Sequence, residues 1–67
     1  MTWKRVNAWT LRAGVFEIEK IERLIDGQFS GNFSYVVWRL EGNTRLPCRG
    51  PFDSAQEAKA VVRDVLS

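Results

Sequence analysis

The stretch DSAQEAKAVVRDVL, residues 53–66, predicts an amphipathic helix that must lie against the rest of the chain. Its apolar side chains recur at the spacing of one helix face, namely Ala55, Ala58, Val62, Val65 and Leu66. Asp53 can cap this helix, and Gln56 at the third helical position completes the pattern of a capping box. We therefore expect a helix over residues 54–66 that buries one apolar stripe against a sheet.

The sheet is indicated just upstream by FSYVVWRL, residues 33–40, which is rich in β-branched and aromatic residues. Alternation along this strand places Trp38 on one face and Tyr35 and Val37 on the other. The next run, residues 44–49, predicts the partner strand. We take the Trp38 face to be the one that the helix covers, which leaves the face of Tyr35 and Val37 open.

The register of this hairpin follows from the side chains that must share a face. Trp38 then belongs with the even-numbered Leu46 and Cys48, because directly opposite residues in an antiparallel pair point to the same side. That pairing requires an odd number of loop residues, and the Glu-Gly-Asn sequence of residues 41–43 fits a three-residue loop. Pro47 indicates an edge strand or a bulge, since proline donates no ladder hydrogen bond.

The N-terminal half predicts strands over residues 3–12 and 15–24, joined by a turn at Ala13 and Gly14. Residues 20–25 allow two interpretations, because the isoleucines and leucine of residues 18–25 also recur at helical spacing. We prefer the strand, since residues 15–19 alternate strictly and Asp-Gly at residues 26–27 is typical of a turn. A bulge near residue 20 would then be needed, and residues 28–32 would form a hairpin tip.

These elements predict one α+β domain that spans residues 1–67. Its sheet is expected to be an antiparallel meander of three or four strands, with the single C-terminal helix packed across one face.

The composition argues against most catalytic chemistry. The chain has no histidine and one cysteine, Cys48, so we expect no catalytic residues, no zinc site and no disulfide. We interpret Cys48 as a small hydrophobic residue under the helix. Glu17 and Glu19 share a strand face, where we expect solvated charges that balance Arg39 or Arg45. Neither enzymatic activity nor a cofactor or metal is predicted.

Charge and hydropathy indicate a cytoplasmic protein. Ten basic and eight acidic residues give a net charge of +2, a mild excess for a nucleic-acid-binding chain. No apolar run follows the charges of Lys4 and Arg5, so we expect no secretory signal. No window is long and apolar enough for a membrane span, and no membrane partner is expected.

Exposed aromatic and basic residues are the candidates for contact with a partner, because one helix covers only part of a sheet. Tyrosine, tryptophan and arginine are enriched at protein-binding hot spots, and they also serve sheets that bind nucleic acid. The candidate partner-binding face comprises Trp9, Tyr35, Val37, Arg39, Arg45 and Arg49, with Lys4 and Arg5 as an alternative basic contact.

Several stretches resemble short uncharacterised proteins encoded by bacteriophages and prophages. They are Trp9, FEIEK at residues 16–20, YVVWR at residues 35–39, and Phe-Asp-Ser followed by Ala-Lys within residues 52–59. A sheet followed by a Phe-Asp-Ser-x-x-x-Ala helix also looks like the arm-type DNA-binding domains of integrases and the plant AP2 domain. In those domains arginines and tryptophans on the sheet face contact the major groove. This chain departs from them by carrying Glu17 and Glu19 on its sheet.

Residues and resemblance together predict a small, non-enzymatic accessory protein of the phage type in the cytoplasm of a bacterial host. We expect it to bind another protein and to inhibit a host factor or defence complex, as a monomer or a homodimer. The alternative is a DNA-binding module that uses the open sheet face, with Arg5, Arg39, Arg45 and Arg49 as contacts.

Overall fold

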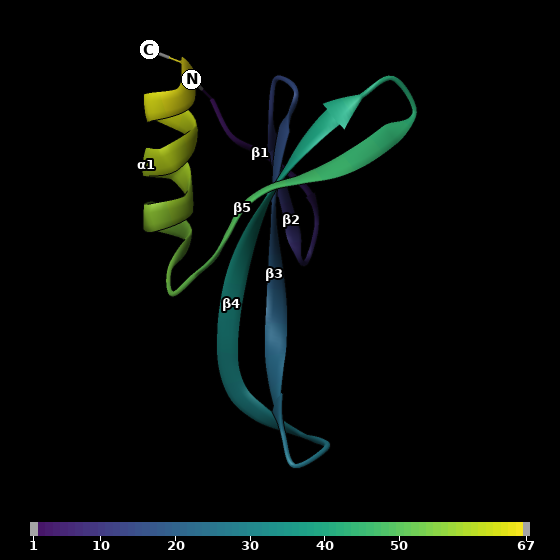
Figure 1. Cartoon of the computed structure of the whole chain (residues 1–67), viewed down its shortest axis with the longest axis vertical. Coiled ribbons are helices and arrows are strands. Elements are labelled where there is room, and N and C mark those ends of the chain that lie inside the picture. The colour runs from purple at the N-terminus through teal and green to yellow at the C-terminus, as the bar shows by residue number, and fades with distance from the viewer. Residues whose placement is uncertain (1, 67) are drawn as a thin grey trace.

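The computed structural model describes residues 2–66 as an antiparallel sheet with one helix against one of its faces (Figure 1). The strands follow one another across the sheet in chain order. The elements are β1 (Lys4–Asn7), β2 (Thr10–Ala13), β3 (Phe16–Ile25), β4 (Gln28–Glu41), β5 (Thr44–Phe52) and α1 (Ala55–Leu66). The predicted α+β class is confirmed, whereas the sheet has five strands rather than three or four. Across residues 2–66, no helix has the length and apolar character needed to cross a membrane.

The additional strand arises because a turn divides the segment predicted as one strand over residues 3–12. Asn7 pairs with Thr10, which leaves Ala8 and Trp9 as the turn between β1 and β2. The Oδ1 atom of Asn7 accepts a hydrogen bond from the backbone N–H of Trp9 at 2.8 Å. A hydrogen bond to an asparagine side chain in this position mimics a backbone turn, so Asn7 stabilises the turn locally.

Strands β3 and β4 form a long hairpin, and residues 20–25 belong to β3. Asp26 and Gly27 close it with φ values of 51° and 77°, as a type I′ turn requires. Residues 28–32, predicted as the hairpin tip, instead begin β4, because the two-residue turn lets Ile25 pair directly with Gln28. The register shift lies two residues beyond the position expected for it, after Glu22.

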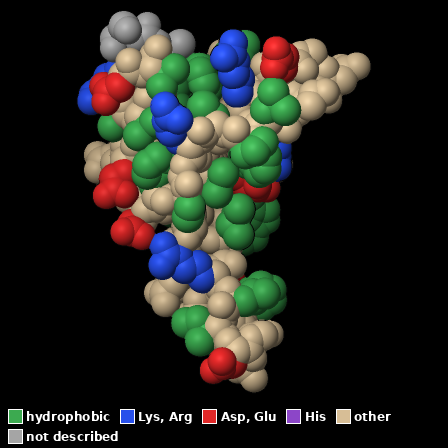
Figure 2. All heavy atoms as spheres, in the orientation of Figure 1, with side chains coloured by type: hydrophobic (Ala, Val, Ile, Leu, Met, Phe, Trp, Pro, Cys, Tyr) green, Lys and Arg blue, Asp and Glu red, His purple; other side chains and the backbone are tan. Residues whose placement is uncertain are grey.

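The far half of this hairpin, residues 21–33, projects beyond the helix and is called the arm (Figure 1). Several apolar side chains are exposed along it (Figure 2), namely Ile21, Leu24, Ile25 and Phe29. Arg23 ties the arm to the segment before the helix, since its Nη2 atom donates to Oδ1 of Asp53 at 2.8 Å. The arm is thus anchored to the body at its base, while its outer part is apolar and exposed.

The hairpin between β4 and β5 is closed by two residues, Gly42 and Asn43, because Glu41 pairs with Thr44. Gly42 has a φ of 60°, which the first position of a type II′ turn requires. The predicted three-residue loop is therefore wrong, since the glycine alone supplies the left-handed conformation that a tight turn needs.

The shorter loop reverses the expected pairing between these strands. Leu40 pairs with Arg45 and Trp38 with Pro47, instead of the even-numbered residues of β5. Pro47 lies on β5, which forms one edge of the sheet, beside a register shift at Val37 and Trp38. Both features predicted for this proline, an edge strand and a bulge, are present.

The helix covers the face opposite to the expected one. The core consists of Phe16, Ile18, Val37, Ala58 and Val62, with Cys48 partly buried against it. Val37 is only 1% exposed, and Trp38, the next residue along the strand, lies on the helix-free face. The prediction failed because both faces of residues 33–40 are apolar. Strand β3 determines which face is buried, because Ile18 lies opposite Val37 and Glu17 lies opposite Trp38.

The helix begins at Ala55, one residue later than predicted, and Ser54 rather than Asp53 is its cap. The Oγ atom of Ser54 accepts a hydrogen bond from the backbone N–H of Glu57 at 3.1 Å. The Glu57 carboxylate accepts one from the backbone N–H of Asp53 at 3.2 Å, in the manner of a capping box. Asp53 is not the cap because its carboxylate binds Arg23. Of the predicted stripe, Val65 is exposed, and the side chain of Leu66 lies outside the described part of the structure.

Candidate functional site

The residues predicted to form one partner-binding face do not share a face. Val37 is buried beneath α1, and Tyr35 packs partly against the same core. Arg45 lies on the helix-free face, opposite Leu40 of β4. The prediction of one shared face is wrong because it assigned the helix to the Trp38 side of the sheet. The observed side-chain positions define the candidate site instead.

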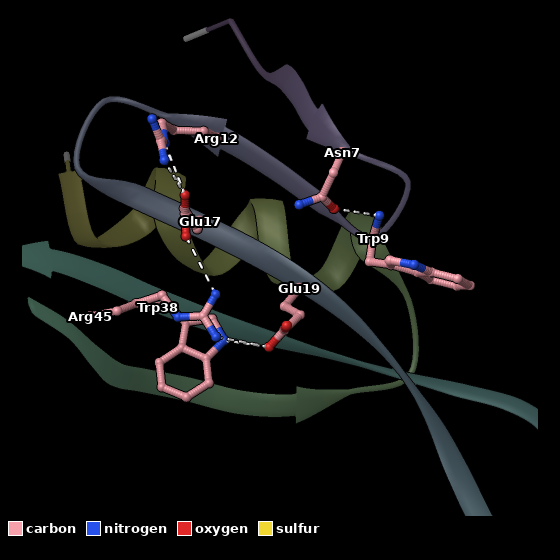
Figure 3. A network of polar contacts seen from close by, with 7 residues as sticks. All are labelled: Asn7, Trp9, Arg12, Glu17, Glu19, Trp38 and Arg45. Atoms are coloured by element: carbon pink, nitrogen blue, oxygen red, sulfur yellow. Dashed lines mark hydrogen bonds and ion pairs between the residues drawn. The ribbon is translucent and has the colours of Figure 1, made fainter.

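The helix-free face carries an ion-pair network centred on Glu17 (Figure 3). Glu17 is 5% exposed, and its Oε2 atom lies 2.6 Å from Nη2 of Arg12. Its Oε1 atom lies 3.5 Å from Nη1 of Arg45. A buried carboxylate needs such partners, because removing it from water is otherwise costly. Arg45 was one of the two predicted partners, but Glu17 is buried rather than solvated.

Glu19 extends the same network to a tryptophan. Its Oε1 atom accepts a hydrogen bond from Nε1 of Trp38 at 3.1 Å and one from Nη2 of Arg45 at 3.2 Å. The Arg45 guanidinium also lies 4.1 Å from the centre of the Trp38 ring, within the range of a cation–π contact. The charged and aromatic groups of this network are therefore engaged with one another.

The four arginines predicted as DNA contacts do not form a common surface. Arg45 is committed to Glu17 and Glu19 on the helix-free face. Arg39 lies opposite Phe16, a core residue, so its side chain leaves the sheet on the helix side. A duplex that met one of these two side chains would therefore face the wrong side of the sheet for the other.

A cleft of about 210 Å³ opens on the helix side, where α1 does not reach the β1–β2 end of the sheet. Leu11, Ile18 and Tyr35 line it from β2, β3 and β4, and Ala55 lines it from the first turn of α1. Trp9 borders the cleft from the β1–β2 turn and is 54% exposed. Figure 3 shows its ring pointing away from the ion-pair network. Two of the predicted site residues, Trp9 and Tyr35, are thus brought together here.

Two cations border this cleft without an acidic partner in the part of the chain that the structure describes. Arg5, one of the alternative basic contacts, comes from β1, and Lys20 comes from β3. Neither takes part in an ion pair within residues 2–66. The Lys20 ammonium lies 4.1 Å from the centre of the Phe33 ring, a contact that leaves its charge unneutralised. The cleft therefore combines aromatic walls with uncompensated positive charge.

A broader hollow of about 440 Å³ lies beside it, where Lys4, Arg5 and Arg12 meet the turn at Gly14. No aromatic side chain lines this hollow, and Arg12 is already bound to Glu17. Within residues 2–66, no three potential metal-ligating side chains lie together. The cleft at Trp9 is accordingly the better candidate site.

No family model matches the chain, and no curated protein or solved structure shows significant similarity to it. The assignment of a function therefore depends on the geometry of the molecule.

The sequence prediction missed the cleft because it placed Trp9 inside a continuous strand. The available signal was Asn7, a residue type that favours turns through its side chain, two positions before Trp9. The other residue that the sequence prediction missed is Lys20, near which it placed only a bulge. Its position in a regular part of β3 lets it stand beside Ile18 and Tyr35 at the cleft.

Proposed function

We propose that this chain is a small, non-enzymatic module that binds another protein through the cleft at Trp9. The observation that supports this most strongly is that Trp9 is half-exposed at the cleft and that the basic side chains there, Arg5 and Lys20, have no acidic partner among the described residues. On the helix-free face Trp38, Arg12 and Arg45 have acidic partners within the chain.

Aromatic and arginine side chains at a concave surface are the usual anchors of a protein interface. Tyr35 is already held by the core on one side, so it meets a partner with little loss of conformational freedom. Trp9 is held by a turn whose backbone is fixed by Asn7. Both aromatic groups are therefore presented by ordered elements, which favours binding.

The resemblance to short phage and prophage proteins supports a partner in the cytoplasm of a bacterial host. Inhibition of a host factor or defence complex is the proposed consequence of that binding. A monomer is the form in which the cleft is open to such a partner.

Affinity capture with matched variants tests the proposal. The immobilised protein is incubated with bacterial lysate, and the retained proteins are quantified for the wild type, Trp9→Ala and Val15→Ala. Val15 is a suitable control because it is a half-exposed apolar residue in the turn between β2 and β3, away from the cleft. We expect a protein that the wild type and Val15→Ala retain and that Trp9→Ala loses. Equal retention by all three, or no retained protein, contradicts the proposal.

A further inference from the structure

We infer that the cleft at Trp9 binds an aromatic side chain flanked by acidic residues in a partner protein. The inference rests on the proposed function and specifies the chemistry of the partner. It combines three properties of the cleft, which are its volume, the nature of its walls and the charge at its border.

The volume fits one aromatic ring. A cavity of about 150 Å³ lined by apolar side chains is large enough to hold benzene, and this cleft has about 210 Å³. Leu11, Ile18 and Ala55 supply aliphatic surface, while Trp9 and Tyr35 supply aromatic surface. Aromatic pairs attract each other in offset or edge-to-face arrangements, so a phenyl group suits these walls better than a polar side chain.

The border of the cleft requires negative charge from its occupant. Arg5 and Lys20 approach from β1 and β3, and neither has an ion-pair partner among residues 2–66. A guanidinium matches the two oxygens of a carboxylate, which makes an acidic residue next to the aromatic one the complementary choice.

The same two cations fit a protein segment better than a single-stranded nucleic acid. Strands of nucleic acid need a continuous basic track for their phosphates in addition to aromatic surfaces for their bases. Here Glu22 follows Lys20 on the same face of β3. A phosphate backbone leaving the cleft along this strand would meet an acidic side chain.

The test uses three blocked pentapeptides, Gly-Asp-Phe-Asp-Gly, Gly-Asn-Phe-Asn-Gly and Gly-Asp-Ala-Asp-Gly. Each is titrated into the ¹⁵N-labelled full chain, and the amide and indole shifts are followed by NMR. We expect the Asp-Phe-Asp peptide to shift the signals of Trp9, Ile18 and Lys20 with a Kd on the order of 1 mM. The Asn peptide should bind at least about threefold more weakly, since an exposed charge pair contributes modestly. The Ala peptide should cause no shifts at the cleft.

Matched variants locate the site. Trp9→Ala should abolish the shifts, and Arg5→Gln should remove the preference for Asp over Asn. Arg49 was predicted as part of the partner-binding face, but it lies on the edge strand β5 and does not line the cleft. Arg49→Gln, which makes the same change of charge, should therefore leave binding unchanged. Trp9, Arg5 and Arg49 are all exposed, so each variant is expected to fold, and its amide spectrum verifies this.

Several results would overturn the inference. They are the absence of shifts with the Asp-Phe-Asp peptide at about ten times the expected Kd, equal affinity for the Asn peptide, and tighter binding of an oligo-thymidine strand to the same residues. Cleft signals that move with protein concentration alone would show instead that a second copy of the chain occupies the cleft. Trp9-dependent capture from lysate without peptide binding would retain the proposed function and reject only the acidic aromatic ligand.

Discussion

Trp38 with Arg45 and Trp9 with Arg5 use the same two residue types in different ways. On the helix-free face the guanidinium of Arg45 lies over the Trp38 ring, and Glu19 binds both side chains. At the cleft, Trp9 and Arg5 border a hollow that no acidic side chain lines. The residue types alone would mark both places as binding surfaces. The two places differ in their internal partners, and this difference supports the proposal that the cleft is the binding site.

The difference originates in the position of each strand within the sheet. Glu17 and Glu19 lie on β3, the central strand, so cations from β2 and β5 can reach them from both sides. Arg5 lies on β1 at the edge of the sheet, where only β2 is its neighbour. Cross-strand pairing therefore accounts for the neutralised network around Glu17 and Glu19, whereas Arg5 at this edge has no acidic neighbour among the described residues.

Substitution in the core tests most strongly which face the helix covers. Val37→Ala removes two methyl groups from a side chain that is 1% exposed, and we expect it to lower the free energy of unfolding by about 2–3 kcal/mol. Val15→Ala, in an exposed turn, should change it by less than about 0.5 kcal/mol. Urea denaturation followed by circular dichroism measures both. Similar values for the two variants would mean that Val37 does not lie beneath α1.

A glycine substitution tests the support that β5 gives to the cleft wall. Gly50 has a φ of 121°, and an added Cβ would lie 3.0 Å from the backbone oxygen of Tyr35. We expect Gly50→Ala to cost about 2 kcal/mol and to shift the amide signals around Tyr35. Gly42→Ala is the control, because its φ of 60° is also left-handed but open space surrounds the added atom. It should cost about 1 kcal/mol, and an equal cost would show that the close approach has no effect.

Substitution of Glu17, at the centre of the ion-pair network, should lower the free energy of unfolding by a somewhat smaller amount. Glu17→Gln keeps the shape of the side chain and removes its charge between Arg12 and Arg45. Hydrogen bonds to charged groups contribute roughly 1.5–3 kcal/mol, and we expect a loss near the lower value, about 1.5 kcal/mol. Thermal and urea unfolding of the purified variant check it. An unchanged stability would mean that water satisfies Glu17 in place of the two arginines.

The helix and the order of the elements could be predicted because their causes are local. Apolar spacing over residues 53–66 and the Asp-Gly turn depend on neighbouring residues alone, and the Glu-Gly-Asn sequence of residues 41–43 indicated where the next hairpin turns but not the length of its loop. The covered face could not be predicted in the same way, since Val37 and Trp38 are both suited to a core. Their assignment depends on Ile18 and Glu17, which are distant in sequence and meet them only across the sheet.

The candidate site was predictable only in part for a related reason. Trp9 and Tyr35 could be selected by residue type, but their proximity depends on the turn at Ala8 and on the uncovered end of the sheet. Arg39 and Arg45 were grouped from alternation, and the two-residue loop at Gly42 placed Arg45 on the helix-free face. One residue of difference in a hairpin loop thus separates a predicted surface into two.

The most direct test of the contrast between the two places is to remove one charge from each. Arg5→Gln and Arg45→Gln make the same chemical change, and their free energies of unfolding can be measured side by side in urea. We expect Arg45→Gln to lose about 1 kcal/mol, because the guanidinium contacts two glutamates and the Trp38 ring. Arg5→Gln should change stability by less than about 0.3 kcal/mol, since an exposed side chain without a partner contributes little to folding. Equal losses, or a larger loss for Arg5→Gln, would contradict the account that Arg45 is paired within the chain and that Arg5 is not, on which the proposal for the cleft rests.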